Sequence, residues 1–325
     1  MPAAQQYNNI TSRLIKGLFF EAIDSTPSWA NLISAEFSSD QSVETYAGLT
    51  NAPMLREWIG GRQKKQVSER TLQITNKDWE STLEISTKDL RRDKTDQIRS
   101  RIAQLAQRAV QHKEKLLSLL IAAGDAATYG YAYTGATTTF FSSTHSYGSN
   151  TNDNTIDVDI SALPVGDTTG AHGSTTAPSV GEMALAIQQG VQQLFGFVDS
   201  EGEPINQNLN SFVIMVPTTL WAVAQSAVAS ALMAQGMTNP LPNSGMSYTV
   251  VPNARINAFT TKFVVFANGG MIRPFITQTE VAPSISALAE GSDYEFQNKA
   301  HLYAVDWSGN VGYFAPDKAC LVTMT

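Results

Sequence analysis

The feature that most constrains the fold is a long amphipathic segment, residues 96–123. Its apolar residues repeat at helical spacing, which predicts a single helix that Asp93 or Asp96 caps and Gly124 ends. At about 1.5 Å per residue this helix is roughly 40 Å long, which is long for a domain of this size. His112 completes its apolar stripe, and we expect a histidine there to be packed and hydrogen-bonded rather than catalytic. The other members of the stripe are Ile98, Ile102, Leu105, Ala109, Leu116 and Leu120.

Residues 66–88 give the strongest strand signal. Two alternating runs flank the polar stretch 75–78, which predicts a β-hairpin with Ile74 opposite Trp79. A two-stranded hairpin alone is marginal in water, so its apolar face needs cover from the rest of the chain or from a neighbouring subunit. That apolar face consists of Leu72, Ile74, Trp79, Leu83 and Ile85.

The remaining segments predict a mixed α+β fold without a βαβ repeat. Scattered apolar residues make 1–50 resemble an arm, and residues 124–178 form a long polar region. The elements expected beyond it are a helix at 179–196, a buried strand at 210–217, a helix at 218–236 capped by Thr218, strands within 262–275, and terminal antiparallel strands that turn at Ser308, Gly309 and Asn310.

Basic and acidic residues are distributed unevenly along the chain. Residues 56–115 hold 15 of the 22 Lys and Arg against 9 acids, whereas residues 116–325 hold 5 against 15. This asymmetry fits either a nucleic-acid-binding patch or complementary surfaces on copies of one molecule. The net charge of −7 favours the second interpretation, because a nucleic-acid binder usually has a basic domain overall.

The composition argues against several other classes of protein. The sequence contains no run of 18 apolar residues, so no transmembrane helix is expected. The N-terminal residues lack the pattern of a signal peptide. Cys320 is the single cysteine, so we expect no intrachain disulfide and synthesis in the cytoplasm. With only four histidines, the chain has little material for a zinc site.

The stretch TTTFFSSTHSYGSN, residues 137–150, contains one candidate catalytic pair, Ser143 and His145. Such a pair needs the base within hydrogen-bond reach and a third group that orients the base, and a spacing of two residues does not supply this. We therefore predict no catalytic residue here. Phe140 and Phe141 are expected to anchor the loop to a core, and His145 to shape the turn by hydrogen bonding.

The stretch NDNTIDVD, residues 152–159, is the candidate for a metal site. A calcium loop of the EF-hand type needs a glycine at its sixth position and a glutamate at its twelfth. Counted from Asp153, these positions hold Val158 and Pro164, so the pattern fails. We predict no metal site and no cofactor.

Several motifs, in one order along the chain, resemble the major head subunit of Mu-like tailed phages. They are LREWIGGRQ at 55–63, LQITNKDWESTLEISTKDLRRD at 72–93, the long helix ending in LLIAAG, and FFSSTHSYG at 140–148. The closing LYAVDWSGNVGYFAPDKACL at 302–321 also resembles the end of that family, whereas 179–290 is similar only in outline.

The resemblance implies the Hong Kong 97-like major capsid fold. In that fold the chain would divide into an N-terminal arm at 1–55, an E-loop hairpin at 56–95, a peripheral domain with the spine helix at 96–189, an axial domain at 190–288, and return strands of the peripheral domain at 289–325. The loop 237–248 would lie near the capsomere axis.

The resemblance also implies a structural protein and not an enzyme. Copies would assemble as hexamers and pentamers into an icosahedral shell around double-stranded DNA, bound without sequence specificity. Scaffold and portal proteins are the expected partners during assembly, a decoration protein is a further one, and no membrane is involved. The protein would be made and assembled in the bacterial host cytoplasm and reside in the virion. Two alternatives stay open: an encapsulin-like compartment shell, and a hydrolase using Ser143 and His145.

The resemblance places the predicted subunit contacts on the E-loop and at its base. The apolar face Leu72, Ile74, Trp79, Leu83 and Ile85 would seal the hairpin onto a neighbouring subunit. The basic residues Arg91, Arg92 and Lys94 would pair with acids across the interface, where ion pairs mainly set register and partner choice.

Overall fold

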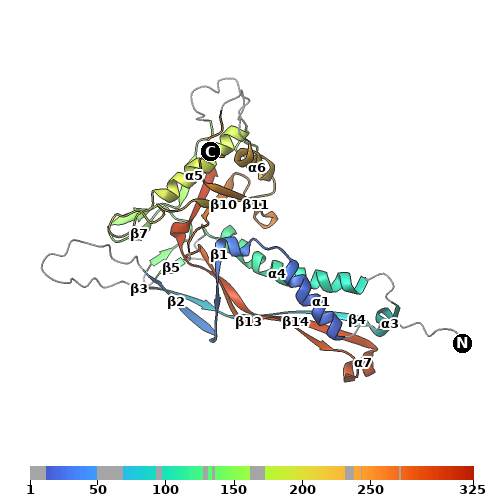
Figure 1. The fold of residues 1–325 in the computed structure, drawn as a ribbon. Coiled ribbons are helices and arrows are strands. Elements are labelled where there is room, and N and C mark those ends of the chain that lie inside the picture. The colour runs from blue at the N-terminus through green and yellow to red at the C-terminus, as the bar shows by residue number, and fades with distance from the viewer. Residues whose placement is uncertain are drawn as a thin grey trace.

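The computed structural model describes residues 12–49, 69–92, 97–126, 131–133, 136–161, 173–230, 238–242, 244–270 and 272–325. They form two layered bodies that share one long helix, α4 (Gln97–Ala122) (Figure 1). One body is built on a five-stranded sheet and the other on a long four-stranded sheet. Helices and strands are mixed without a regular βαβ repeat, so the fold class is α+β, as the sequence predicted.

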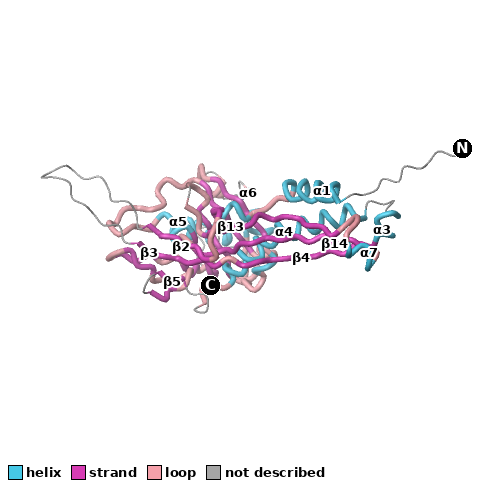
Figure 2. Tube along the Cα trace, turned by 90° about the horizontal axis from the view of Figure 1, so that it is seen from below, coloured by secondary structure: helices cyan, strands magenta, loops and turns pink. Residues whose placement is uncertain are grey.

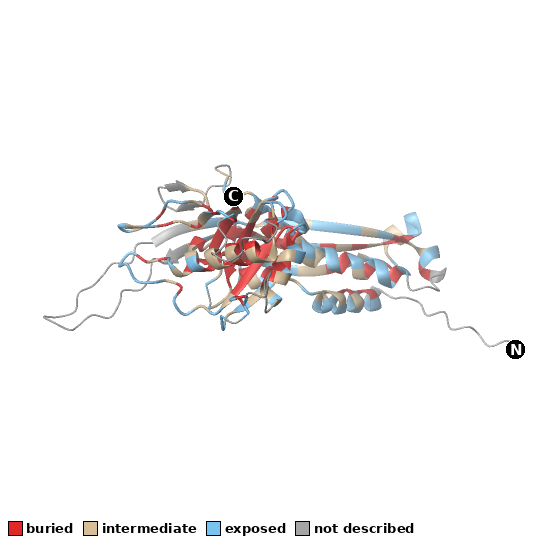
Figure 3. Cartoon of the chain, turned by 90° about the horizontal axis from the view of Figure 1, so that it is seen from above, coloured by how far each residue is buried: buried red, intermediate tan, exposed pale blue. Residues whose placement is uncertain are grey.

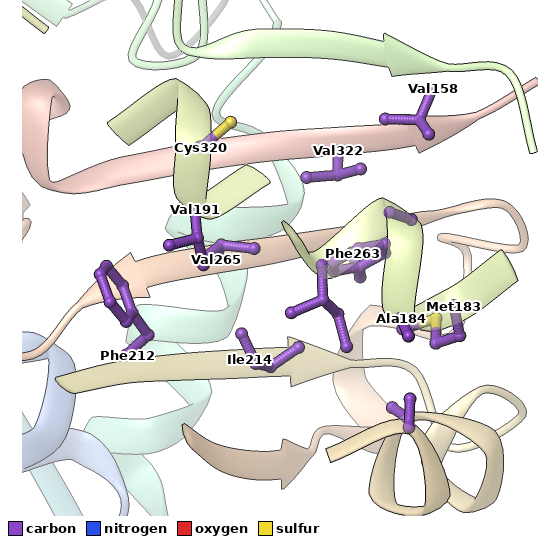
Figure 4. Packing of buried hydrophobic residues seen from close by; sticks show 14 of the residues in the cluster. Val158, Met183, Ala184, Val191, Phe212, Ile214, Phe263, Val265, Cys320 and Val322 are labelled. Carbon is purple, nitrogen blue, oxygen red and sulfur yellow. The ribbon is translucent and has the colours of Figure 1, made fainter. Parts of the chain in front are cut away.

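The five-stranded sheet is buried on both faces. In spatial order its strands are β11 (Ser247–Pro252), β10 (Ser211–Val216), β12 (Lys262–Ala267), β15 (Ala319–Met324) and β9 (Thr155–Val158). Helices α5 (Val180–Phe195) and α6 (Trp221–Ala229) cover one face, where Val191 packs near Val265 (Figure 4). On the other face, Val264 and Phe266 join the C-terminal half of α4. Burial on both faces explains the nearly continuous apolar runs of these strands in the sequence.

Helices cover one face of the long four-stranded sheet. In spatial order its strands are β1 (Ser34–Ser38), β13 (Phe275–Leu288), β14 (Ala300–Tyr313) and β4 (Lys77–Ser86). Helix α1 (Ser12–Ser25) lies beside α4 on this face, where Ile15, Ile102 and Tyr303 belong to one cluster (Figure 1). Figure 2 shows the opposite side, with the strands β4, β13 and β14 running along the length of the body.

Helix α4 joins the two bodies. Its N-terminal half packs on the four-stranded sheet through residues such as Ile102, as the stripe predicted. In its C-terminal half the fully buried residues are Leu117 and Ile121, whereas the predicted Leu116 and Leu120 are only half-buried. The stripe shifts by one residue because this half packs against a different core. Figure 3 shows buried residues concentrated where the sheets and α4 meet.

A two-stranded ribbon leaves the body at the end opposite α3 (Thr87–Arg92) and α7 (Asp293–Asn298) (Figure 2). Its strands β2 (Val43–Leu49) and β3 (Glu69–Thr75) pair antiparallel. The other short elements are helix α2 (Ala30–Ile33), strands β5 (Tyr131–Tyr133), β6 (Ala136–Thr138), β7 (His145–Tyr147) and β8 (Asn150–Asn152), and the 3₁₀ turns Ala254–Ile256 and Pro316–Lys318.

Several local predictions are confirmed. The predicted helix at 179–196 is α5, and Ser179 begins it with a capping box: its hydroxyl accepts from the backbone of Glu182, whose carboxylate accepts from the backbone of Ser179. The helix predicted from Thr218 is described over α6, and Thr218 does not cap it. Its hydroxyl donates to Asn257 Oδ1 at 3.0 Å instead.

The predicted hairpin about residues 75–78 is wrong. Only Asn76 separates β3 from β4, and the chain runs on without turning back. β3 pairs with β2, whereas β4 pairs with β14, so Trp79 lies opposite Trp307 and not opposite Ile74. The alternating pattern located both strands, but alternation has the same period whichever strand lies alongside. Pairing with β14 extends a four-stranded sheet that covers its apolar face with α4, which an isolated hairpin cannot do.

The predicted turn at Ser308, Gly309 and Asn310 is also wrong, because β14 runs straight through it. Gly309 has a different reason to be a glycine. A Cβ there would lie 2.3 Å from the backbone oxygen of Gln278, on the adjacent strand β13. The glycine therefore permits a close approach of two strands rather than a change of direction.

The expected boundaries at 190 and 288 do not separate the two sheets. Strand β13 (275–288) belongs to the four-stranded sheet, and the final strand, β15, lies in the five-stranded one between β12 and β9. The chain therefore crosses between the bodies more often than a division into consecutive segments implies. Its C-terminal strand ends in the five-stranded sheet because both faces of β15 are apolar and need burial.

Candidate assembly interface

The ribbon β2–β3 is fixed at its root. Tyr46 Oη donates to Gln278 Oε1 at 2.9 Å, and Gln278 Nε2 donates to Asn76 Oδ1 at 2.6 Å. Burial, and secondarily the charge of Glu44, raise the pKa of Tyr46 to about 12, so its hydroxyl remains a donor at neutral pH. The Tyr46 ring also packs edge-on against Phe37, with 5.5 Å between ring centres. These contacts set the direction in which the ribbon leaves the body.

The five apolar residues predicted to contact a neighbour are largely covered by their own chain. Ile74 is 4% exposed and lies against Gly312, and Ile85 is 1% exposed within the α1–α4 cluster. The prediction that these two residues face another subunit is therefore wrong. The half-buried members of the set are Leu72, Trp79 and Leu83.

Trp79 instead belongs to an aromatic cluster at the edge of the long sheet. The ring of His112 lies 4.4 Å from that of Trp79 and 5.6 Å from that of Trp307, centre to centre. The two indoles are stacked 6.4 Å apart, and Trp79 Nε1 donates to Gly309 O at 3.1 Å. These rings border a cavity of about 210 Å³ between α4 and the sheet, which we call the aromatic crevice. Its lining also includes Glu80, Leu105, Arg108, Ala109 and Val305.

His112 is packed, as predicted, but its ring is not fully hydrogen-bonded. Its Nε2 is buried and has no hydrogen-bond partner among the described residues. Burial, and secondarily the positive charge of Lys115, lower the pKa of His112 below 6.5. The imidazole is therefore neutral at pH 7.

Acid should destabilise the subunit through His112. In the unfolded chain the imidazole of His112 takes up a proton near pH 6.5, whereas in the folded chain it does so only at lower pH. The contribution of the neutral imidazole to the free energy of unfolding is therefore complete above pH 6.5 and is lost as the pH falls below that value. We expect His112→Gln to reduce the fall in urea midpoint between about pH 7.5 and about pH 5.5. An equal fall in the parent protein and the variant would contradict this assignment.

The loop that contains Phe140, Phe141 and His145 is pinned to the core, as predicted. Phe140 is fully buried and stacks on Tyr313, with 4.8 Å between ring centres. Phe141 is buried against Gly124, where a Cβ would lie 2.6 Å from the Phe141 ring. His145 Nε2 lies 3.0 Å from the carbonyl oxygen of Phe140, and because a carbonyl can only accept, Nε2 is the donor.

This geometry gives no support to a hydrolase. Ser143 is exposed, whereas His145 is buried and its Nε2, which a general base needs free, is bound to a backbone carbonyl. Asn154 reinforces the same turn, because its Nδ2 donates to Phe140 O at 2.9 Å and its Oδ1 accepts from the backbone of Ser142 at 2.8 Å. The histidine therefore has a structural role.

Comparison with known families shows a similarity over part of the chain. Residues 10–169 match the family described as Mu-like prophage major head subunit gpT. These residues make up just under half of the chain. The Mu-like prophage FluMu major head subunit of Haemophilus influenzae is 29% identical over 150 residues, which are 44% of this chain and 47% of the relative. The matched region thus spans about half the length of that curated relative.

Solved capsid structures share the fold of this chain. The procapsid protein of bacteriophage JBD30 aligns with a TM-score of 0.52 and 20% identity over 95% of this chain and 72% of its own. The capsid protein of the cyanophage P-SCSP1u aligns with a TM-score of 0.57 and 10% identity over 92% and 89%. At these identities the similarity concerns the fold alone, and the fold is the Hong Kong 97-like capsid fold.

The role of the basic residues predicted at the interface stays a prediction. Arg91 and Arg92 lie at the end of α3, but their side chains fall outside the described part of the chain, as Lys94 does. In the acidic stretch 152–159, Asp153 Oδ1 accepts from the backbone of Thr155 at 2.8 Å. Within the described ranges, no group of three or more His, Cys, Asp or Glu is placed to hold a metal ion.

Sequence reasoning missed the aromatic crevice and the exposed helix α7. Trp307 lies far from Trp79 in the sequence, and both were assigned to strands without a common partner. The sequence feature that could have indicated the crevice was His112, a polar ring on the apolar stripe of the long helix.

None of the helices in the described ranges has the length and apolar character needed to cross a membrane.

Proposed function

We propose that the chain is a major capsid protein that self-assembles into the icosahedral head shell enclosing phage double-stranded DNA. The observation that carries this proposal is the Hong Kong 97-like fold in a chain whose residues 10–169 match a major head subunit family. A head subunit acts by contacts with copies of itself. The function is therefore structural, and we assign the chain no catalytic activity.

Its shape supports this assignment. The ribbon β2–β3 projects from the body on a fixed root, as an element that reaches another subunit would (Figure 1). We propose that this ribbon, with the segment 50–68 that links its strands, is the E-loop. The five-stranded body would then be the axial domain, with 237–248 near the capsomere axis, and the long four-stranded body with α4 the peripheral domain.

The proposed partners follow from the same role. Copies would form hexamers and pentamers, with scaffold and portal proteins during assembly and a decoration protein on the finished shell. The packaged DNA would be held without sequence specificity, since the net charge of −7 and the acidic region 116–325 do not favour tight nucleic-acid binding. Assembly would take place in the cytoplasm of the bacterial host, and the protein would reside in the virion.

Electron microscopy of the purified protein, alone and co-expressed with its scaffold, tests this function. We expect closed icosahedral particles, and nuclease-protected double-stranded DNA in particles from phage-producing cells. Particles that contain a protein cargo and no DNA would favour the encapsulin-like alternative. Failure to form particles under both conditions would contradict the proposal.

A further inference from the structure

We propose that Phe296 of one copy inserts into the aromatic crevice of a second copy. This inference rests on the proposed function, because it identifies one contact through which subunits of the shell would meet. It also gives a role to two features that folding of the single chain leaves unexplained, an almost fully exposed phenylalanine and a cavity lined by aromatic rings.

Phe296 is displayed by a fixed element. It is 88% exposed, whereas the other exposed large apolar residues in the described ranges are between 38% and 56% exposed. It lies on α7, at the far end of the long sheet between β13 and β14 (Figure 1). Ser292 Oγ accepts from the backbone of Glu295, Lys299 N donates to the carbonyl of Glu295, and the Glu295 carboxylate lies 3.0 Å from His301 Nε2. Both ends of this short helix are thus tied down.

The aromatic crevice fits a single apolar side chain. Its volume of about 210 Å³ lies below the roughly 300–1,000 Å³ typical of small-molecule pockets. Trp79, His112 and Trp307 supply three rings, and aromatic rings attract one another in edge-to-face and offset stacks. Trp307 Nε1, like His112 Nε2, is buried and lacks a hydrogen-bond partner among the described residues. A phenylalanine ring offers no ordinary acceptor, but its face can receive a weak N–H···π contact from the Trp307 indole.

Phe296 cannot reach the crevice of its own chain. Strand β14 begins at Ala300, and the crevice lies beside Trp307, seven residues farther along the strand. At about 3.3 Å per residue this separation is roughly 23 Å. Because α7 is held at both ends, Phe296 can enter the crevice only of another copy.

Charge favours the same pairing. The segment 289–299, which displays Phe296, carries three acids and one base, whereas residues 105–116 of α4 carry three bases, of which Lys113 is paired with Glu36, and one acid; Glu80 also lines the crevice. Opposite charges of this kind steer two surfaces together and suppress wrong registers. The contact joins different patches on the two copies, so it can repeat from subunit to subunit and close into a ring. The charged residues are Glu290, Asp293, Glu295 and Lys299 in the first segment, and Arg108, Lys113, Glu114 and Lys115 in the second.

A photo-crosslinking phenylalanine analogue at position 296 tests the inference directly. Particles would be assembled from a mixture of isotopically light and heavy subunits, irradiated, digested and analysed by mass spectrometry. We expect light–heavy crosslinks to the peptides that contain Trp79, Leu105 or Trp307. Crosslinks to α7 of another copy, to residues 50–68, to any other surface, or only within one copy would overturn the inference.

Substitutions provide an independent test of the same contact. Phe296→Ser, and Ala109→Trp, which fills the crevice, should each lower the particle yield about tenfold or more, whereas Phe296→Leu should retain most of it. Circular dichroism would confirm that the variant subunits are folded. Normal particles from Phe296→Ser would refute this contact and leave the capsid function intact, whereas absence of particles from the parent protein would refute both.

Discussion

Replacing Phe140 by alanine should lower the free energy of unfolding of the subunit by about 3–5 kcal/mol. Phe140 is fully buried and touches the rings of Phe141, Phe275 and Tyr313. These neighbours belong to separate elements that meet at the junction of the two bodies, so the cavity left behind cannot collapse easily. Urea denaturation of unassembled subunits, followed by fluorescence, measures the loss.

Phe296→Ala is the matched control for this experiment. It removes the same atoms from a side chain that is 88% exposed, so the free energy of unfolding should change by less than about 0.5 kcal/mol. The two variants should therefore separate two properties: Phe140→Ala weakens the subunit itself, and Phe296→Ala weakens only contacts between subunits. Similar losses of subunit stability in both would contradict the assignment of Phe140 as an anchor.

Shortening the ribbon should give a folded subunit that forms no shells. Leu49 and Glu69 lie opposite each other in β2 and β3, so residues 50–68 can be replaced by an Asn-Gly turn that closes a two-residue hairpin. The root contacts of Tyr46 and Gln278 stay in place, and subunit stability should change little. Electron microscopy should show a loss of particles, because the element proposed to reach the neighbouring subunit is gone.

A second variant distinguishes the reach of the ribbon from its chemistry. It keeps the length of the segment 50–68 but replaces its residues by glycine and serine. Loss of particles in both variants would show that the side chains of 50–68 make the contact, whereas loss in the short variant alone would show that length suffices. Normal shells from the short variant would rule out the ribbon as the E-loop.

Much of the local structure could be predicted from the sequence, because periodicity and capping are local properties. The 3.6-residue spacing of apolar residues located α4 and α5, and the structure adds the capping box of Ser179 and Glu182 at the start of α5. Phe140 and Phe141 are adjacent apolar residues in a polar region, which predicted that they would be buried in a core, and both are buried. The same reasoning failed at Gly309, where a glycine is required by a neighbouring backbone and not by a turn.

The candidate site was predicted less well than the fold. The apolar face that includes Ile74 and Ile85 was recognised, but which surface covers such a face depends on which strand pairs with β4. That partner, β14, is more than 200 residues away, and nothing in the pattern of residues 66–88 specifies it. The aromatic crevice has the same origin, since Trp79 and Trp307 come together only through this pairing.

By itself, the sequence determined the α+β class, the long helix, several strands, the buried phenylalanine loop and the resemblance to a head subunit family. These features depend on residues close to one another along the chain, whose spacing alone sets which face is apolar. Only the tertiary structure decided that β3 and β4 belong to different sheets, that Ile74 and Ile85 are used inside the subunit, and that Phe296 is left outside. Pairing and burial depend on contacts between distant segments, where many partners satisfy the same alternation and the whole fold selects one.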